Sequence, residues 1–166
     1  RAALERFFTD EETGLFRGPY VRLRLPFAPA ESGWEQFLLH CPKDFLPYGH
    51  QAAAFKRLSS ANGHTPEPTV VTTGTGSGKT ESFLLPILDH VVRTNETGQR
   101  GMKAIILYPM NALANDQARR LTDLLTSEPQ YRGVTAALYT GEAGSTGRTK
   151  VSPRGLITSR EVIRSK

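Results

Sequence analysis

The stretch that decides the fold is Thr73-Gly74-Thr75-Gly76-Ser77-Gly78-Lys79-Thr80. Its glycines allow the backbone to curl until successive N–H groups face a single anion. A β-branched run at 69–72 precedes this stretch, and an amphipathic helix is expected to follow it over 79–93. A glycine-rich turn between a strand and a helix N-terminus is the setting in which such a loop binds phosphate.

This loop is predicted to bind ATP and Mg²⁺ through all eight of its residues. We expect the Lys79 ammonium to reach the β- and γ-phosphates and the Thr80 hydroxyl to ligate Mg²⁺. Lys79 and Thr80 are therefore the predicted catalytic residues, and Thr80 is the predicted metal ligand. The strict pattern has glycine where Thr73 stands. The alternative, a glycine-rich surface turn with a solvated lysine, stays open.

Apolar runs alternate with helical patterns on both sides of the loop. The expected helices cover 51–58, 79–93 and 112–125, and the expected strands cover 69–72, 104–108, 134–139 and 155–159. This alternation is typical of an α/β fold with a parallel sheet flanked by helices. We divide the chain into an N-terminal extension or accessory segment, 1–47, and a partial nucleotide-binding domain, 48–166.

The extension has a mixed pattern, with a helix end over 2–8, an alternating strand over 21–25 and a short helix over 34–40. Asp89 ends an apolar run, as a Mg²⁺-binding aspartate on a strand does. It lies on the helix that must follow the loop, however, so we interpret it as a solvated helix residue.

Composition limits the possible partners. The 166 residues carry a net charge of +5, which favours a polyanion such as nucleic acid. Cys41 is the single cysteine, so no disulfide or cysteine-based zinc site is possible within this chain, and a cytoplasmic location is expected. No run of 18 apolar residues is present, and we therefore expect no membrane partner.

Three segments around the loop narrow the class. They are Tyr48-Gly49-His50-Gln51, Tyr108-Pro109-Met110-Asn111-Ala112-Leu113-Ala114-Asn115-Asp116-Gln117 and Tyr139-Thr140-Gly141-Glu142. In this order they resemble the first RecA-like domain of a superfamily 2 DEAD/DEAH-type helicase, over roughly residues 45–166. The chain is also similar to large bacterial helicases of the Lhr-like and MrfA-like type, and to helicases of the phage-defence systems DISARM and Druantia.

The resemblance implies roles for residues outside the loop. Gln51 matches the glutamine that reads the adenine edge, since a carboxamide donates and accepts hydrogen bonds at once. Tyr48 would stack on the base or pack beside it. The residues that the resemblance places near the nucleic-acid backbone are Pro109, Met110, Asn111, Thr140 and Gly141. The alternatives are that Gln51 is a surface glutamine, that the turn with Pro109 and Asn111 is a plain strand-to-helix connection, and that Thr140 and Gly141 belong to an ordinary loop.

The family's later motifs have no counterpart here. No Asp-Glu pair follows an apolar strand, and neither the coupling motif nor the second RecA-like domain is found. We therefore expect this chain alone not to hydrolyse ATP, because transition-state stabilisation would be missing.

The expected function is the ATP-binding segment of an ATP-dependent DNA helicase or translocase, in anti-phage defence or DNA repair. Its partners would be nucleic acid, with DNA favoured over RNA, and the rest of the helicase chain or a complex subunit. Two alternatives remain. One is a catalytically incomplete nucleotide-binding or subunit-interaction module. The other is a different phosphate-loop enzyme such as a small-molecule kinase, against which Gln51 and 111–117 argue.

Overall fold

The structure is a computed structural model that describes residues 2–10, 12, 14–15, 25–140 and 156–157. The described helices and strands are, in chain order, α1 (Ala2–Thr9), η1 (Glu35–Phe37), α2 (Gly49–Leu58), α3 (Lys79–Glu96), α4 (Asn111–Ser127), η2 (Pro129–Tyr131), β1 (Ala136–Ala137) and β2 (Leu156–Ile157). The expected helices at 51–58, 79–93 and 112–125 are confirmed as α2, α3 and α4, and the helix end at 2–8 as α1. Among these described residues, no helix is long and apolar enough to cross a membrane.

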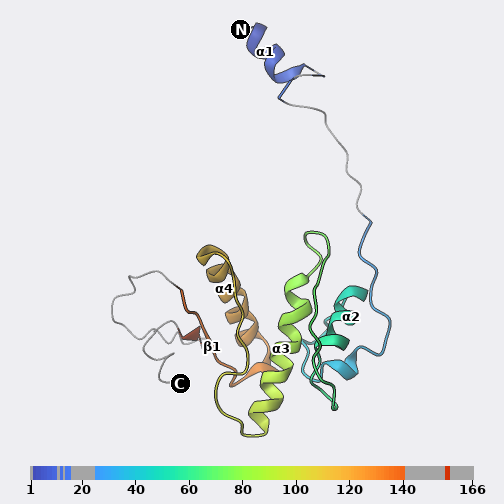
Figure 1. The fold of residues 1–166 in the computed structure, drawn as a ribbon, viewed down its shortest axis with the longest axis vertical. Coiled ribbons are helices and arrows are strands. Elements are labelled where there is room, and N and C mark those ends of the chain that lie inside the picture. Colours follow the sequence, from blue (N-terminus) through green and yellow to red (C-terminus); the bar gives the residue numbers. More distant parts are fainter. Residues whose placement is uncertain (1, 11, 13, 16–24, 141–155, 158–166) are drawn as a thin grey trace, which may run out of the picture.

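Helix α3 lies between α2 and α4 (Figure 1). On the side of α2, Leu85 packs with Phe55, Phe37 and Leu38. On the other side, a second cluster contains Leu88, Val92, Leu125, Tyr131 and Val134. The spacing of Leu85, Leu88 and Val92 places apolar side chains on successive turns of α3, so that one helix contributes to two clusters. This packing fixes α3, and with it the loop that leads into its N-terminus.

The sheet differs from the prediction. β1 and β2 form a parallel pair with Ala136 opposite Leu156 and Ala137 opposite Ile157, within the strands expected at 134–139 and 155–159. The segments 69–72 and 104–108 are not strands, so this prediction is wrong, and two of their apolar residues are open to solvent: Val70 is 87% exposed and Leu107 is 86% exposed. A strand needs a neighbour to pair its N–H and C=O groups, and no described residue pairs with these two segments.

Asp89 is buried, which contradicts its interpretation as solvated. Its side chain is 1% exposed. The backbone N–H groups of Leu39 and His40 each donate to Asp89 Oδ1 at 2.8 Å, and Arg93 Nε donates to Oδ2 at 2.9 Å. The segment after η1 folds back over α3 and covers the carboxylate, which sequence periodicity does not reveal. Only Glu35–Phe37 of the short helix expected over 34–40 is helical, and the strand expected over 21–25 lies almost wholly outside the described residues.

Candidate nucleotide-binding site

The loop 73–80 turns sharply before α3 begins at Lys79. Gly76 and Gly78 have φ values of +78° and +75°, in the left-handed region that favours glycine. Gly78 is also the N-cap residue of α3. The glycine spacing in the sequence therefore corresponds to two left-handed turns at the N-terminus of a helix, which is the local geometry expected of a phosphate-binding loop.

The Lys79 side chain curls back over its own loop. Its Nζ donates to the carbonyl oxygen of Thr73 at 2.9 Å and to that of Gly74 at 2.7 Å. The hydroxyls of Thr73 and Ser77 hydrogen-bond to each other, and Ser77 is fully buried. The structure thus brings Thr73, Gly74, Ser77 and Lys79 together, with the ammonium group held by neutral carbonyl oxygens that an anionic phosphate would outcompete.

Helix α2 holds the loop in place. Gln51 is 3% exposed, and its Nε2 donates to the Gly78 carbonyl oxygen at 3.0 Å. Its Oε1 accepts the Tyr48 N–H at 2.8 Å, which caps the helix. His50 Nε2 donates to the Ser77 carbonyl oxygen at 2.8 Å. His50 was not among the predicted site residues; the signal that could have found it is its place beside Gln51 on the helix that touches the loop.

Gly78 has little space for a side chain. A Cβ atom there would lie 2.3 Å from Gln51 Nε2 and 3.2 Å from Glu81 Oε2. Two side chains from different helices therefore close on the last glycine of the loop. This contact explains why glycine is needed here for space as well as for its positive φ.

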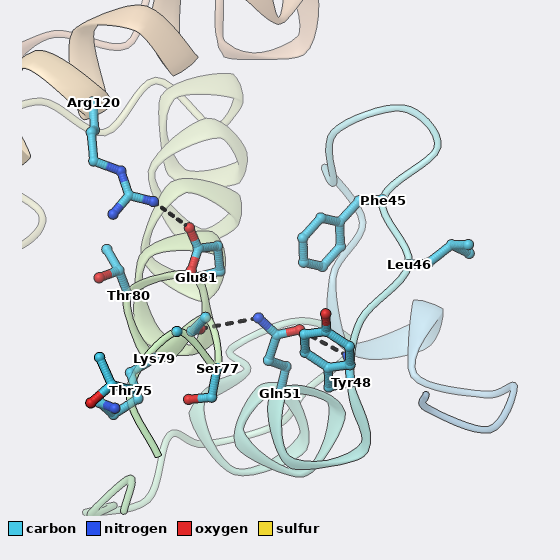
Figure 2. Close-up of a pocket in the computed structure, with 12 residues that line it drawn as sticks. Phe45, Leu46, Tyr48, Gln51, Thr75, Ser77, Lys79, Thr80, Glu81 and Arg120 are labelled. Carbon is cyan, nitrogen blue, oxygen red and sulfur yellow. Dashed lines mark hydrogen bonds and ion pairs between the residues drawn. The ribbon is translucent and has the colours of Figure 1, made fainter. Parts of the chain in front are cut away.

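The loop forms one wall of a cavity of about 610 Å³. This volume is within the range of small-molecule and cofactor pockets. The lining residues are Phe45, Leu46, Tyr48, Gln51, Thr75, Gly76, Ser77, Gly78, Lys79, Thr80, Glu81 and Arg120 (Figure 2). The cavity brings together most of the predicted cofactor-binding residues. Thr73 and Gly74 do not line the cavity, but their carbonyl oxygens bind the Lys79 ammonium.

One end of the cavity is aromatic and apolar. Figure 2 shows Phe45, Leu46 and Tyr48 across from the loop. The Tyr48 ring stacks on His50 with centroids 5.8 Å apart and an 18° angle between the ring planes, and Phe27 lies 5.4 Å from Tyr48. Sequence reasoning found Tyr48 but missed Phe27, Phe45 and Leu46, because the segment that carries them has no helical or strand period.

The other end of the cavity carries charge. Arg120 Nη2 of α4 donates to Glu81 Oε1 of α3 at 2.7 Å. Burial raises the pKa of Tyr108, and the positive charge of Arg120 partly opposes this rise. Arg120 therefore acts on Glu81 and on Tyr108 from α4. Neither charged residue was predicted, since a solvated helix face carries similar residues.

Of the predicted nucleic-acid residues, none that the structure describes lines this cavity. Pro109 and Met110 are exposed in the turn before α4, and Asn111 is its first residue. Thr140 follows β1 at the end of the described segment, and Gly141 lies outside the described residues. The described residues contain no group of three or more His, Cys, Asp or Glu side chains that could hold a metal ion.

The sequence pattern described as DEAD/DEAH box helicase matches residues 48–165, which is most of the chain and includes the loop, α2, α3 and α4. The chain belongs to the DEAD/DEAH box helicase family. Membership implies a RecA-like α/β fold for this helicase segment, of which the described residues show the helices and one short parallel pair. The match begins at Tyr48, the N-cap residue of α2.

The chain is similar to three helicase relatives or defence proteins over different parts of its length. Druantia protein DruE of Escherichia coli is 47% identical over 111 residues, which are 64% of this chain and 6% of the relative. The uncharacterized ATP-dependent helicase YprA of Bacillus subtilis is 30% identical over 71% of this chain and 14% of its own length. The ATP-dependent RNA helicase DBP4 of Meyerozyma guilliermondii is 36% identical over 45% of this chain and 9% of the relative. The helicase segment thus spans a small part of these relatives, and no solved structure matches it.

Proposed function

We propose that the cavity between α2 and α3 binds ATP for an ATP-dependent helicase or translocase of which this chain is the ATP-binding segment. The observation that carries this proposal is the loop itself. Two left-handed glycines precede a helix N-terminus, the Lys79 ammonium lies within the loop, and Gln51 and His50 fix the loop from α2. A preorganised loop of this kind binds phosphate without having to fold on arrival.

The adenine base fits the aromatic end of the cavity. Tyr48 is 37% exposed and offers its ring beside the side chain of Gln51. Each of the two polar ends of the Gln51 amide makes one hydrogen bond to the backbone. A carboxamide has two N–H donors and two oxygen lone pairs, so one of each remains for the edge of a base. Gln51 would then hold the loop and read adenine with the same side chain.

The residues around Thr80 fit a magnesium ion that arrives with the nucleotide. Thr80 is the second residue of α3 and lines the cavity, next to Lys79. Mg²⁺ takes several of its ligands from water and substrate phosphates, so a single hydroxyl is a sufficient protein contribution. When bound, the ion would neutralise the β- and γ-phosphate charge. Lys79 would exchange its two carbonyl partners for phosphate oxygens and hold the triphosphate against the helix N-terminus.

Nucleic acid is the proposed partner of the turn at 109–111, with Thr140 and Gly141 as the further proposed contacts. The exposed turn ends at the N-terminus of α4, where backbone N–H groups suit phosphate oxygens. The net charge of +5 supports a polyanionic partner. DNA is favoured over RNA, and the 47% identity to DruE supports a role in anti-phage defence, with DNA repair as the second candidate.

The test is the Lys79→Ala variant of the protein that contains this chain. Binding of a fluorescent ATP analogue and ATP turnover with single-stranded DNA are expected to be lost, because the ammonium is the loop's one side-chain cation for the phosphates. Lys103→Ala is the control, since Lys103 binds the carbonyl oxygens of Gln99 and Gly101 away from the cavity. Unchanged turnover in Lys79→Ala would refute the assignment. Replacing the DNA by RNA of the same sequence distinguishes the two polymers.

A catalytically incomplete binding module is the second candidate. The observation that favours it is the exposure of Val70, Ile105 and Leu107, which are 87%, 67% and 86% exposed. Apolar side chains in extended segments favour cover by another strand or subunit. ATP binding without any turnover, in the protein that contains this chain and with DNA present, would favour the module over the enzyme.

A further inference from the structure

A charged pair closes one end of the cavity. Glu81 is the third residue of α3 and Arg120 lies in the middle of α4, and their side chains meet at 2.7 Å beyond Thr80 (Figure 2). Both residues line the cavity together with the loop. The pair therefore connects the helix that begins at the loop with the helix that begins at the turn 109–111.

The Glu81 carboxylate lies against the loop. Its Oε2 would be 3.2 Å from a Cβ atom on Gly78, while its Oε1 accepts the bond from Arg120. A carboxylate in this position faces the space that a triphosphate would occupy. The negative charges of the carboxylate and of a bound triphosphate would repel each other, and this repulsion is stronger in a partly buried cavity than in water. An unpaired Glu81 would consequently weaken the binding of an anionic nucleotide.

The pair is not needed to hold the helices together. Its side chains are 53% and 28% exposed, and pairs of this exposure contribute little to stability. Leu88 and Leu125 already pack α3 and α4 together in one apolar cluster. What distinguishes the pair is its location beside the loop rather than its strength.

We propose that Arg120 is a positioning residue of the nucleotide site. It neutralises Glu81 beside the nucleotide phosphates, and it makes α4 respond to whether those phosphates are bound. This inference rests on the proposed ATP-binding function. Arg120 also acts electrostatically on Tyr108, the residue that precedes the turn 109–111. A phosphate beside the Arg120–Glu81 pair would add negative charge next to Glu81, and this change in charge would act on both helices that the pair joins. The nucleic-acid turn would thereby respond to nucleotide without a direct contact between the two ligands.

The first experiment measures nucleotide affinity in the full-length protein with a fluorescent ATP analogue. Arg120→Gln is expected to raise the Kd about three- to fivefold, a change of the size that an exposed charge produces. Arg119→Gln, which removes the same charge at the neighbouring exposed position outside the cavity, should leave the Kd within about twofold. The double variant Glu81→Gln with Arg120→Gln should regain the wild-type Kd. Failure of the double variant to regain affinity would overturn the neutralising role, since it would mean that Arg120 binds the phosphates itself.

The second experiment measures the link to α4. Single-stranded DNA should stimulate ATP turnover less in Arg120→Gln than in the wild type. The double variant should keep this defect although its nucleotide affinity returns, because no charged pair then joins α3 and α4. Normal stimulation by DNA in the double variant would overturn the proposed link between the nucleotide site and α4. If Arg120 had a purely structural role, nucleotide affinity and stimulation by DNA would change together.

The two proposals fail in different ways. If the wild-type protein does not bind the ATP analogue, or if Lys79→Ala binds it normally, the nucleotide site itself is wrong. If the wild type binds the analogue, Lys79→Ala does not, and Arg120→Gln behaves as Arg119→Gln does, only the role of Arg120 is wrong.

Discussion

The side-chain nitrogen of Gln51 donates a hydrogen bond to the carbonyl oxygen of Gly78 at 3.0 Å, across 27 residues of sequence. The same amide accepts the N–H of Tyr48 at 2.8 Å. One buried side chain thus joins the start of α2 to the N-cap residue of α3. The loop between Thr73 and Thr80 owes its position to this contact as well as to its own glycines.

Replacement of Gln51 by alanine should therefore affect stability and nucleotide binding together. The part-buried N–H of Tyr48 would lose its partner, and an unpaired group of this kind costs about 1–3 kcal/mol. The Gly78 carbonyl oxygen would lose its bond to α2 and keep only those from Ser82. Urea unfolding should show a lower free energy of unfolding, and the ATP analogue should bind more weakly. Gln36→Ala is the control, because that exposed amide also donates to a carbonyl oxygen, that of Gly33 at 2.8 Å, but away from the loop. If Gln51→Ala and Gln36→Ala changed stability and nucleotide binding equally, the proposal that Gln51 joins α2 to the loop would be contradicted.

Gly78→Ala should impair nucleotide binding beyond its effect on stability. The new Cβ atom would meet Gln51 Nε2 at 2.3 Å and the residue would keep a φ of +75°. Gly98→Ala is a matched control, since Gly98 has a φ of +76° but no atom within 4 Å of its Cβ position. Both variants should lose about 1–2 kcal/mol of stability from the left-handed backbone. Only Gly78→Ala should also raise the Kd for the ATP analogue, and a similar rise in both would be evidence against the contact.

Asp89→Ala should destabilise the fold strongly. The carboxylate accepts two backbone N–H groups from 39–40 and pairs with Arg93 at 2.9 Å, and its removal leaves these donors without their acceptor. Loss of one partner from a buried charged pair costs about 3–5 kcal/mol, with the lower end expected because Arg93 is 20% exposed. Chemical denaturation checks the value. Asp116→Ala, on the exposed face of α4, should change stability by less than about 0.5 kcal/mol.

Alkaline pH should destabilise the same region. Burial, aided by the charges of Asp89 and Glu128, raises the pKa of the Cys41 thiol from 9.0 to about 12. The folded state therefore binds a proton that the unfolded state has already released. The stability from this group is complete below about pH 9 and is lost as the pH rises toward 12.

The slope from one proton cannot exceed about 1.4 kcal/mol per pH unit, and partial solvent screening reduces it. Unfolding curves between pH 8 and about pH 11 should show this loss, and Cys41→Ala should flatten it. Burial also raises the pKa of Tyr131, so Tyr131→Phe should remove a separate part of the loss above pH 10. A Cys41→Ala protein with an unchanged pH profile would show that the thiol does not contribute.

The helices were predictable from sequence because their signals are local. The apolar spacing of 79–93 predicts α3, and the glycines before it predict the turn that leads into it. Tyr48 and Gln51 could be placed beside the loop only through resemblance, since nothing in their own spacing requires it. Their contact with a nucleotide stays a prediction, although both residues line the cavity.

The features that sequence reasoning missed depend on contacts between distant segments. Asp89 was interpreted as solvated because its helical position does not show that 39–40 folds over it. Arg120 meets Glu81 across 39 residues, and neither residue has a local pattern that distinguishes it from a solvated charge. The segments 69–72 and 104–108 have the composition of strands, yet strand pairing depends on neighbours that the described residues do not supply.

The protected thiol of Cys41 has a practical consequence for spectroscopy. It is the only cysteine of the chain, and its raised pKa keeps it almost wholly in the unreactive protonated form at neutral pH. Cysteines introduced at the exposed positions of Leu46 and Arg119 would therefore react with maleimide dyes in preference to the native one. A dye pair at these two positions would report by energy transfer whether the apolar end of the cavity and helix α4 approach each other when nucleotide is added.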